Sequence, residues 1–226
     1  MIARIVILFL FGLPNILSLQ LSIHNLSKQF PKSLWRTLTS SVPVGQYALK
    51  SISLEADSEF LLLLGASSSG KSTVLQCILE GSMKLSEPAV RPIYLDRKPD
   101  VYSQPNKPIG ESLLKTSTNR LQHWSKVMEL DLSLTFSDLS PSQVYQYALV
   151  HACCQSHENS PLLLLDEWMD KETSVVVQKV ELSLLRLAEQ GAIILCVTHK
   201  PEMFAKSHRR ITLCRGEILA DEPEEF

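Results

Sequence analysis

The sequence has no dense cluster of basic residues and no excess of positive charge. Its 22 Lys and Arg residues stand against 24 Asp and Glu residues, which gives a formal net charge of −2. Proteins that hold nucleic acid through its phosphates carry a basic patch or stripe on one face. We therefore expect no nucleic-acid partner for this chain.

The sequence also lacks the C-x-x-C spacing that is typical of zinc sites and redox pairs. Most of its cysteines fall in apolar patterns that helices and strands bury, where a free thiol packs as a small apolar side chain. We expect reduced core thiols in a reducing compartment, and we interpret the adjacent Cys153 and Cys154 as helix packing rather than redox chemistry. The five cysteines are Cys77, Cys153, Cys154, Cys196 and Cys214.

The apolar N-terminus is too short and too interrupted for a clear membrane span. Its dense apolar part runs only from Ile5 to Leu13, whereas a span needs about 20 mostly apolar residues. A short apolar run behind Arg4 has the shape of a signal peptide, and a plain extension and a true anchor are the alternatives. We expect residues 1–18 to form this apolar leader and residues 19–226 to form the folded domain.

A phosphate-binding loop pattern is the strongest feature that the sequence does contain. Residues 65–73 read GASSSGKST and match G-x-x-x-x-G-K-[ST], directly behind the apolar run 60–64. The two glycines allow the tight backbone path in which successive N–H groups converge on phosphate oxygens, and a following helix adds its positive N-terminal end. We expect Lys71 to reach the terminal phosphates as one of the catalytic residues, and Ser72 to bind a magnesium ion. The loop residues predicted to bind the nucleotide are Gly65, Ala66, Ser67, Ser68, Ser69, Gly70, Lys71, Ser72 and Thr73.

A second apolar strand, at residues 162–165, ends in two acidic residues. Ligands of open α/β sheets bind at the carboxyl ends of the strands, so Asp166 is predicted to hold the magnesium ion, directly or through water. Glu167 is predicted to orient and deprotonate the attacking water. One strand and helix later, His199 follows the apolar run 192–197. We expect its imidazole to hydrogen-bond the phosphate and the water as a further catalytic residue.

Hydrophobic periodicity predicts an α/β fold. Apolar runs separated by helical patterns indicate a mostly parallel sheet that is covered on both faces. Alternating apolar and polar residues near the N-terminus indicate a small antiparallel layer attached to it. A polar turn is expected at residues 55–59. The expected strands are 19–24, 49–54, 60–64, 93–96, 162–165 and 192–197, and the expected helices are 74–80, 119–130, 142–154 and 173–189.

The order of these motifs over residues 19–223 resembles the nucleotide-binding domain of ABC-type ATPases. LLLLDE resembles the family's magnesium and catalytic-glutamate motif, and VTHKPEMF resembles its switch-histidine motif. In IHNLSKQF, Phe30 takes the place of the aromatic that stacks on adenine; in VYSQP, Gln104 resembles the glutamine that senses magnesium and contacts the membrane partner. The resemblance implies a P-loop NTPase fold of ABC type. It also implies a shortened helical subdomain, because the interval from Lys71 to Asp166 is shorter here than is usual in the family.

The chain departs from the family at the signature motif. The family reads LSGGQ, and residues 139–143 here read LSPSQ. The resemblance implies that Ser140, Ser142 and Gln143 act in trans on the nucleotide of a second subunit. Pro141, however, has no N–H to donate and has a fixed φ. The comparison with the family therefore implies that the P-loop part of the nucleotide site is intact and that the signature part is damaged.

The loop behind the catalytic glutamate is a second departure. The family has an aspartate at the end of this loop, and an ungapped reading puts Thr173 in its place, with Asp170 three residues earlier. Neither residue receives a predicted role from this pattern.

The resemblance implies an ATP- and Mg²⁺-dependent ATPase that powers a membrane permease through nucleotide-driven dimer closure. A second nucleotide-binding subunit, identical or homologous, would complete the site. The alternatives are a degenerate subunit that pairs with an active homologue and a soluble ABC ATPase outside transport. Simple P-loop kinases and GTPases rank lower, because the signature-like LSPSQ and the switch histidine have no role there. The sequence also has no N-K-x-D tetrad, the motif that reads guanine. The expected location is the cytosolic face of a membrane, or an organelle such as a plastid if the leader is a targeting signal.

Overall fold

The computed structural model describes residues 19–29, 47–86, 90–96, 106–113, 117–156 and 160–224. The expected leader at 1–18, the expected adenine-stacking Phe30 and the expected magnesium-sensing Gln104 lie outside these residues. Among the helices that the structure describes, none combines the length and the apolar character that a bilayer-spanning segment needs.

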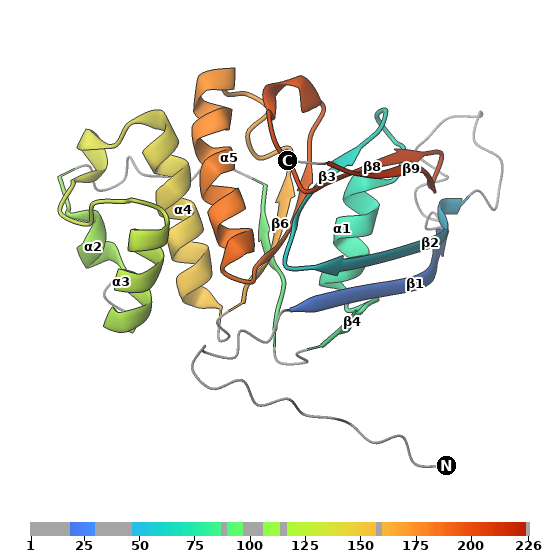
Figure 1. Ribbon diagram of the computed structural model, residues 1–226, viewed down its shortest axis with the longest axis horizontal. Coiled ribbons are helices and arrows are strands. Elements are labelled where there is room, and N and C mark those ends of the chain that lie inside the picture. The colour runs from blue at the N-terminus through green and yellow to red at the C-terminus, as the bar shows by residue number, and fades with distance from the viewer. Residues whose placement is uncertain are drawn as a thin grey trace, which may run out of the picture.

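A six-stranded sheet forms the centre of the molecule (Figure 1). Its strand order is β5-β6-β7-β3-β8-β9, and every neighbouring pair is parallel except β8 and β9. The strands are β3 (Phe60–Leu64), β5 (Ile93–Leu95), β6 (Leu162–Asp166), β7 (Ile193–Val197), β8 (Arg209–Cys214) and β9 (Glu217–Pro223). The predicted mostly parallel sheet is confirmed.

A three-stranded antiparallel sheet forms a second layer, with the order β2-β1-β4. Its strands are β1 (Gln20–Gln29), β2 (Tyr47–Asp57) and β4 (Lys84–Leu85). This layer was predicted, but the polar turn expected at 55–59 is wrong. Strand β2 continues through Ala56, which is buried and pairs with Leu21 of β1. The reason is that the period-two alternation of inward-facing residues in β2 does not stop at Leu54.

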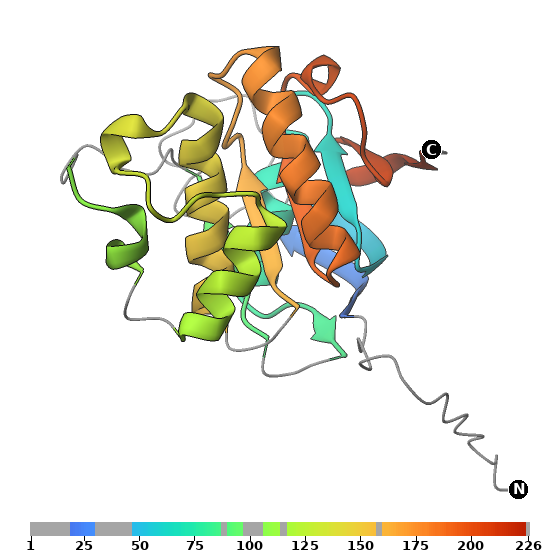
Figure 2. The same ribbon diagram turned by 60° about the vertical axis from the view of Figure 1, so that its left-hand side comes forward.

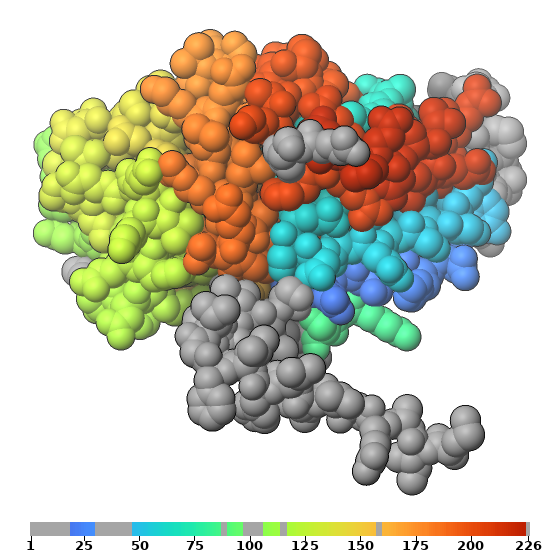
Figure 3. Space-filling model, viewed as in Figure 1, coloured from blue at the N-terminus to red at the C-terminus, as the bar shows by residue number. Residues whose placement is uncertain are grey.

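Helices cover both faces of the six-stranded sheet, as predicted (Figures 1 and 2). Helix α1 lies between the two sheets, α4 and α5 cover the opposite face, and α3 packs against α4. In the space-filling view, α5 lies at the surface between α3 and α4 on one side and β8 and β9 on the other (Figure 3). The helices are α1 (Lys71–Leu79), α2 (Ile109–Ser112), α3 (Thr118–Val127), α4 (Pro141–Gln155) and α5 (Ser174–Glu189), with 3-10 turns at Phe136–Asp138 and Pro201–Met203.

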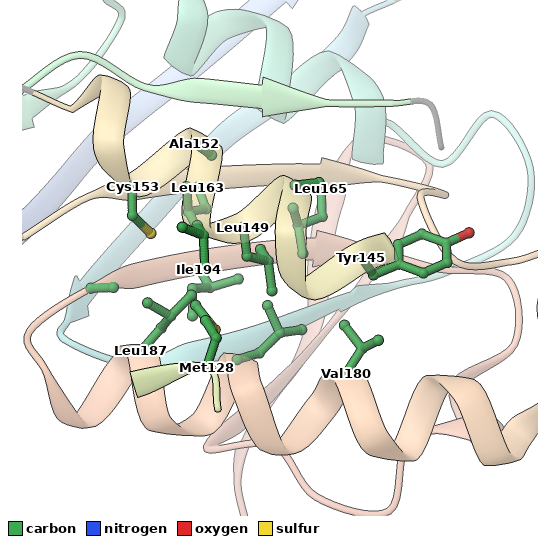
Figure 4. Close-up of a cluster of buried hydrophobic side chains, with 14 of the residues drawn as sticks. Met128, Tyr145, Leu149, Ala152, Cys153, Leu163, Leu165, Val180, Leu187 and Ile194 are labelled. Atoms are coloured by element: carbon green, nitrogen blue, oxygen red, sulfur yellow. The ribbon is translucent and has the colours of Figure 1, made fainter. Parts of the chain in front are cut away.

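Successive residues of each buried strand enter two different cores. Leu162 and Leu164 of β6 pack with α1 and the antiparallel layer, whereas Leu163 and Leu165 pack with α4 and α5. Figure 4 shows the second core, where Leu163 and Leu165 lie near Leu149 of α4. Full burial of one leucine side chain stabilises by roughly 1.5–3 kcal/mol. Burial on both faces explains why this strand is an unbroken run of leucine.

Four of the five cysteines are buried and all five are free, in agreement with the prediction of core thiols. The exposed one is Cys214. Cys153 points into the core beneath α4 (Figure 4), and burial raises the pKa of its thiol. The adjacent pair Cys153 and Cys154 therefore serves helix packing, as expected.

Candidate nucleotide-binding site

The strand order brings three functional loops to one edge of the sheet. Strand β7 lies between β3, which leads into the P-loop, and β6, which ends at Asp166. All three strands are parallel, so their carboxyl ends meet at the same edge, where ligands of open α/β sheets bind. The P-loop, the acidic pair Asp166 and Glu167, and His199 behind β7 are therefore neighbours in space, as the sequence predicted.

The P-loop has the tight backbone path that a phosphate cradle needs. Gly65 has φ +136°, and a Cβ there would come within 2.2 Å of the Leu213 carbonyl oxygen. Gly70 has φ +113° and packs against Leu49, so both positions require glycine. The Ser69 hydroxyl is buried and has no hydrogen-bond partner among the described residues. A buried polar atom without a partner in such a cradle fits a bound phosphate.

Lys71 is held inside the loop rather than in solvent. Lys71 is the first residue of α1, and only 4% of its surface is exposed. The ammonium donates hydrogen bonds to the carbonyl oxygens of Gly65 at 2.9 Å and Ala66 at 3.0 Å. Burial lowers the pKa of Lys71, and the nearby charges of Glu167 and Asp166 oppose that shift. A partly desolvated cation in this position is poised to pair with a polyphosphate.

Ser72 and Asp166, the two residues predicted to bind the magnesium ion, are in contact. The Ser72 hydroxyl donates to Asp166 Oδ1 at 3.1 Å. A hydroxyl and a carboxylate oxygen are the ligands that Mg²⁺ takes in nucleotide sites, where phosphates and waters complete the octahedron. The described residues therefore fit Mg²⁺ bound together with a nucleotide.

Tyr94 also contacts Asp166, and this contact was not predicted from the sequence. Its hydroxyl donates to Asp166 Oδ2 at 2.7 Å, so both oxygens of the carboxylate are engaged. Burial and the hydrogen bond to Asp166 raise the pKa of the Tyr94 phenol, which keeps it protonated as a donor at neutral pH. The available signal was its place in an apolar run beside the acidic strand, but the pairing of β5 with β6 was needed to interpret it.

Glu167 and His199 are in direct contact. His199 Nε2 lies 2.8 Å from Glu167 Oε1, and because a carboxylate only accepts, the imidazole donates. The side chains are 50% and 36% exposed, so solvent reaches the pair. Glu167 also has φ +51°, an uncommon backbone conformation for a residue with a side chain, and its N–H donates to the Val197 carbonyl oxygen at 3.0 Å. The turn behind β6 thus aims Glu167 at the histidine loop.

Asp170 is a second residue that the sequence left without a role. Its Oδ1 accepts from the Thr198 hydroxyl at 2.7 Å, and its Oδ2 accepts from the His199 N–H at 2.9 Å. The Thr198 oxygen also accepts from the Lys200 N–H at 3.0 Å. Thr173, the other residue considered for the family aspartate, stands at the N-cap of α5. Asp170 therefore connects the loop behind β6 to the loop behind β7 that carries His199.

The signature-like residues begin α4, away from the P-loop strand. Ser140 is the N-cap, and both its N–H and its hydroxyl donate to Gln143 Oε1, at 2.9 and 2.8 Å. Pro141 occupies the first helical position, and Ser142 is only 7% exposed. Glu129, Ser140, Ser142, Gln143, Gln146, Lys179, Leu182 and Arg186 line a pocket of about 310 Å³ at this end of α4. The hydroxyl and amide groups predicted to act in trans are engaged with one another here.

Comparison with known proteins shows which proteins this chain is similar to. No protein-family model matches the chain. The chain is 28% identical over 218 aligned positions to the macrolide export ATP-binding/permease protein MacB of Campylobacter jejuni subsp. jejuni serotype O:2, covering 80% of this chain and 33% of that protein. MacB of serotype O:23/36 matches with the same identity and coverage. The chain therefore spans about a third of the length of the curated relatives it matches.

Solved structures show the same fold. The ADP conformation of MJ1267, an ATP-binding cassette of an ABC transporter, superimposes with a TM-score of 0.62 at 16% identity, over 92% of this chain and 91% of that chain. The dimeric cassette MJ0796 bound to ADP and Pi has a TM-score of 0.58 at 21% identity, over 91% of this chain and 100% of that chain. The chain therefore has the fold of the ATP-binding cassettes of ABC transporters, with its P-loop, its acidic strand and its histidine loop at one sheet edge.

Proposed function

We propose that this chain binds ATP together with Mg²⁺ and hydrolyses the ATP. The observation that carries the proposal is the meeting of the P-loop, the Ser72–Asp166 pair and the Glu167–His199 pair at one sheet edge. Support also comes from the MacB relative, which is named an ATP-binding protein, and from the MJ0796 cassette, which was solved with ADP and Pi.

The residues divide the chemistry between them. Lys71 and the N–H groups of the P-loop bind and orient the phosphates. Ser72 and Asp166 hold Mg²⁺, which supplies charge stabilisation at the phosphates when it is bound. Glu167 accepts the proton of the attacking water, and His199 holds its carboxylate through the 2.8 Å hydrogen bond. Phe30 and Gln104 stay predicted contacts to adenine and to the metal.

Two substitutions test this function. Lys71→Ala is expected to abolish Mg²⁺-dependent ATP binding, because it removes the buried cation of the loop. Glu167→Gln is expected to retain ATP binding and to lower turnover by about 10²–10⁴-fold, the usual contribution of a general base. Calorimetric titration and phosphate release measure the two effects.

The exposed Lys126 of α3 offers a matched control, since Lys126→Ala removes a lysine far from the sheet edge. Unchanged turnover in Glu167→Gln would refute the general-base role, and no Mg²⁺-dependent binding in the wild type would refute the function itself.

We further propose that closure of this domain on a second nucleotide-binding subunit drives a membrane permease. The MacB relative is named an ATP-binding/permease protein, and MJ0796 is a dimeric cassette of an ABC transporter. Native pull-down followed by mass spectrometry distinguishes the permease-bound form from a soluble ABC complex. Recovery of soluble partners alone would contradict a role in transport.

The signature residues favour one variant of this function, a subunit that relies on an active homologue. Pro141 removes one N–H from the start of α4, and Ser140 and Gln143 bond to each other. In this variant the chain turns over ATP slowly as a homodimer and faster with a partner that carries LSGGQ. Replacing both Pro141 and Ser142 by glycine is then expected to raise homodimer turnover, and an unchanged rate would count against the variant.

A further inference from the structure

The Asp166 carboxylate is held between two hydroxyl groups from two different elements. Ser72 of α1 donates to Oδ1 at 3.1 Å, and Tyr94 of β5 donates to Oδ2 at 2.7 Å. The shorter bond is the one to Tyr94. Of the two hydroxyls, only Ser72 belongs to the P-loop pattern.

The sheet register explains how Tyr94 reaches an aspartate on the neighbouring strand. β5 and β6 are parallel, with Tyr94 opposite Leu164 and Leu95 opposite Leu165. Ile93 and Leu95 pack against the core of α4 and α5, so Tyr94 between them points to the other face, which α1 covers. Ser72 begins α1 on that same face. The phenol therefore approaches Asp166 from the outer edge of the sheet, and Ser72 approaches it from the P-loop side.

We propose that Tyr94 is a positioning residue for the metal: its hydroxyl holds Oδ2 and so turns Oδ1 toward Ser72 and the Mg²⁺ that they share. This inference rests on the proposed function. Carboxylates that bind metals are usually themselves hydrogen-bonded, and loss of such a partner weakens metal affinity by about 10–100-fold. Tyr94 is 37% exposed, so replacing it by phenylalanine removes the hydroxyl without disturbing a packed core.

The test separates metal binding from nucleotide binding. The affinity of a non-hydrolysable ATP analogue is measured by calorimetry in excess EDTA and then over a series of Mg²⁺ concentrations. For Tyr94→Phe, we expect the wild-type affinity in EDTA and an approximately 10-fold increase in the Mg²⁺ concentration at half-effect. Mn²⁺ bound with the analogue gives a second readout, because its paramagnetic resonance spectrum reports the ligand geometry.

Two variants complete the experiment. Tyr147→Phe is the matched control, since its hydroxyl lies 3.0 Å from Ser112 Oγ in the helical part of the molecule, and its Mg²⁺ dependence should equal that of the wild type. In an Asp166→Ala background, Tyr94→Phe should have no further effect on Mg²⁺ dependence, because Tyr94 acts through the carboxylate that alanine lacks.

Three results would overturn the inference. Unchanged Mg²⁺ dependence in Tyr94→Phe would show that the hydrogen bond does not set the metal site. Loss of affinity in EDTA as well would show an effect on the nucleotide or the fold instead. An equal effect in the Asp166→Ala background would show that Tyr94 acts by another route. Wild-type protein without any Mg²⁺-dependent binding would refute the proposed function first, and this result differs from all three.

Discussion

Single residues at the sheet edge are ordered by hydrogen bonds between loops that are far apart in sequence. Asp170 is the clearest case, because its two carboxylate oxygens hold the Thr198 hydroxyl and the His199 N–H. Those bonds place the imidazole within 2.8 Å of Glu167. The position of the Glu167–His199 pair therefore depends on a residue without a role predicted from the sequence.

Replacing Asp170 tests this dependence. Asp170→Ala leaves the buried Thr198 hydroxyl and the His199 N–H without their acceptor, so the free energy of unfolding should fall by about 1–3 kcal/mol. Turnover should fall more than the affinity for ATP, because His199 loses its position. Chemical denaturation and steady-state kinetics measure the two quantities.

Asp131→Ala is the matched control. The Asp131 carboxylate also accepts two hydrogen bonds, from the Ser133 N–H at 2.9 Å and hydroxyl at 2.8 Å, but within its own exposed loop. Its replacement should leave turnover unchanged. Equal effects of the two substitutions would argue against the positioning role of Asp170.

At the scale of elements, the residues that resemble the family signature motif form a helix cap at the start of α4. Ser140 and Gln143 bond in the manner of a capping box, and Pro141 has the fixed φ that suits a first helical residue. The Ser140–Gln143 hydrogen bonds and Pro141 both stabilise this end of the helix. Ser140 and Gln143 are also residues that we predicted to act in trans on a nucleotide.

The cap can be measured by substitution. Ser140→Ala should lower the free energy of unfolding by about 1 kcal/mol, within the 0.5–2 kcal/mol range of N-cap losses. Gln143→Ala should have a similar effect, and the double variant should lose less than the sum, because the two side chains share their hydrogen bonds. Ser117 at the N-cap of α3 takes part in no capping box, so Ser117→Ala should cost less. Additive losses would contradict a shared cap.

At the scale of the whole molecule, a partly buried histidine joins the central strand β3 to the C-terminal strand β8. His208 precedes β8, and its Nδ1 accepts the N–H of Phe60, the first residue of β3, at 3.2 Å. An accepting nitrogen must be unprotonated. Burial lowers the pKa of His208 below its usual 6.5, although the charge of Glu189 opposes this shift.

Stability should therefore depend on pH through His208. As the pH falls below 6.5, the unfolded chain takes up a proton at this residue before the folded chain does, so the free energy of unfolding decreases. The contribution is fully present above pH 6.5 and is lost as the pH falls through the folded-state pKa of His208.

Denaturation curves at pH 7.5 and pH 5.5 should show a smaller loss of stability for His208→Asn than for the wild type, because other acidic groups titrate equally in both. His123→Asn on the exposed side of α3 is the control. The same pH dependence in all three proteins would rule out His208 as its source.

Much of this protein could be predicted from its sequence, because the relevant patterns are local. The P-loop glycines, the unbroken leucines of β6 and the alternation in β1 each specify their own conformation or burial. The two carboxylates and His199 could be placed at the sheet edge because parallel strands end on the same side. The fold and most of the candidate site followed from those signals.

Only the tertiary structure decided the contacts that organise the site. Tyr94 reaches Asp166 because the register of β5 against β6 sets it beside that carboxylate, and Asp170 reaches His199 because two loops from neighbouring strands meet. Neither contact can be predicted from the spacing of residues in the sequence, since both depend on how separate segments pack. The sequence thus identified the candidate site residues, and the packing of strands and loops determined which residues hold them in place.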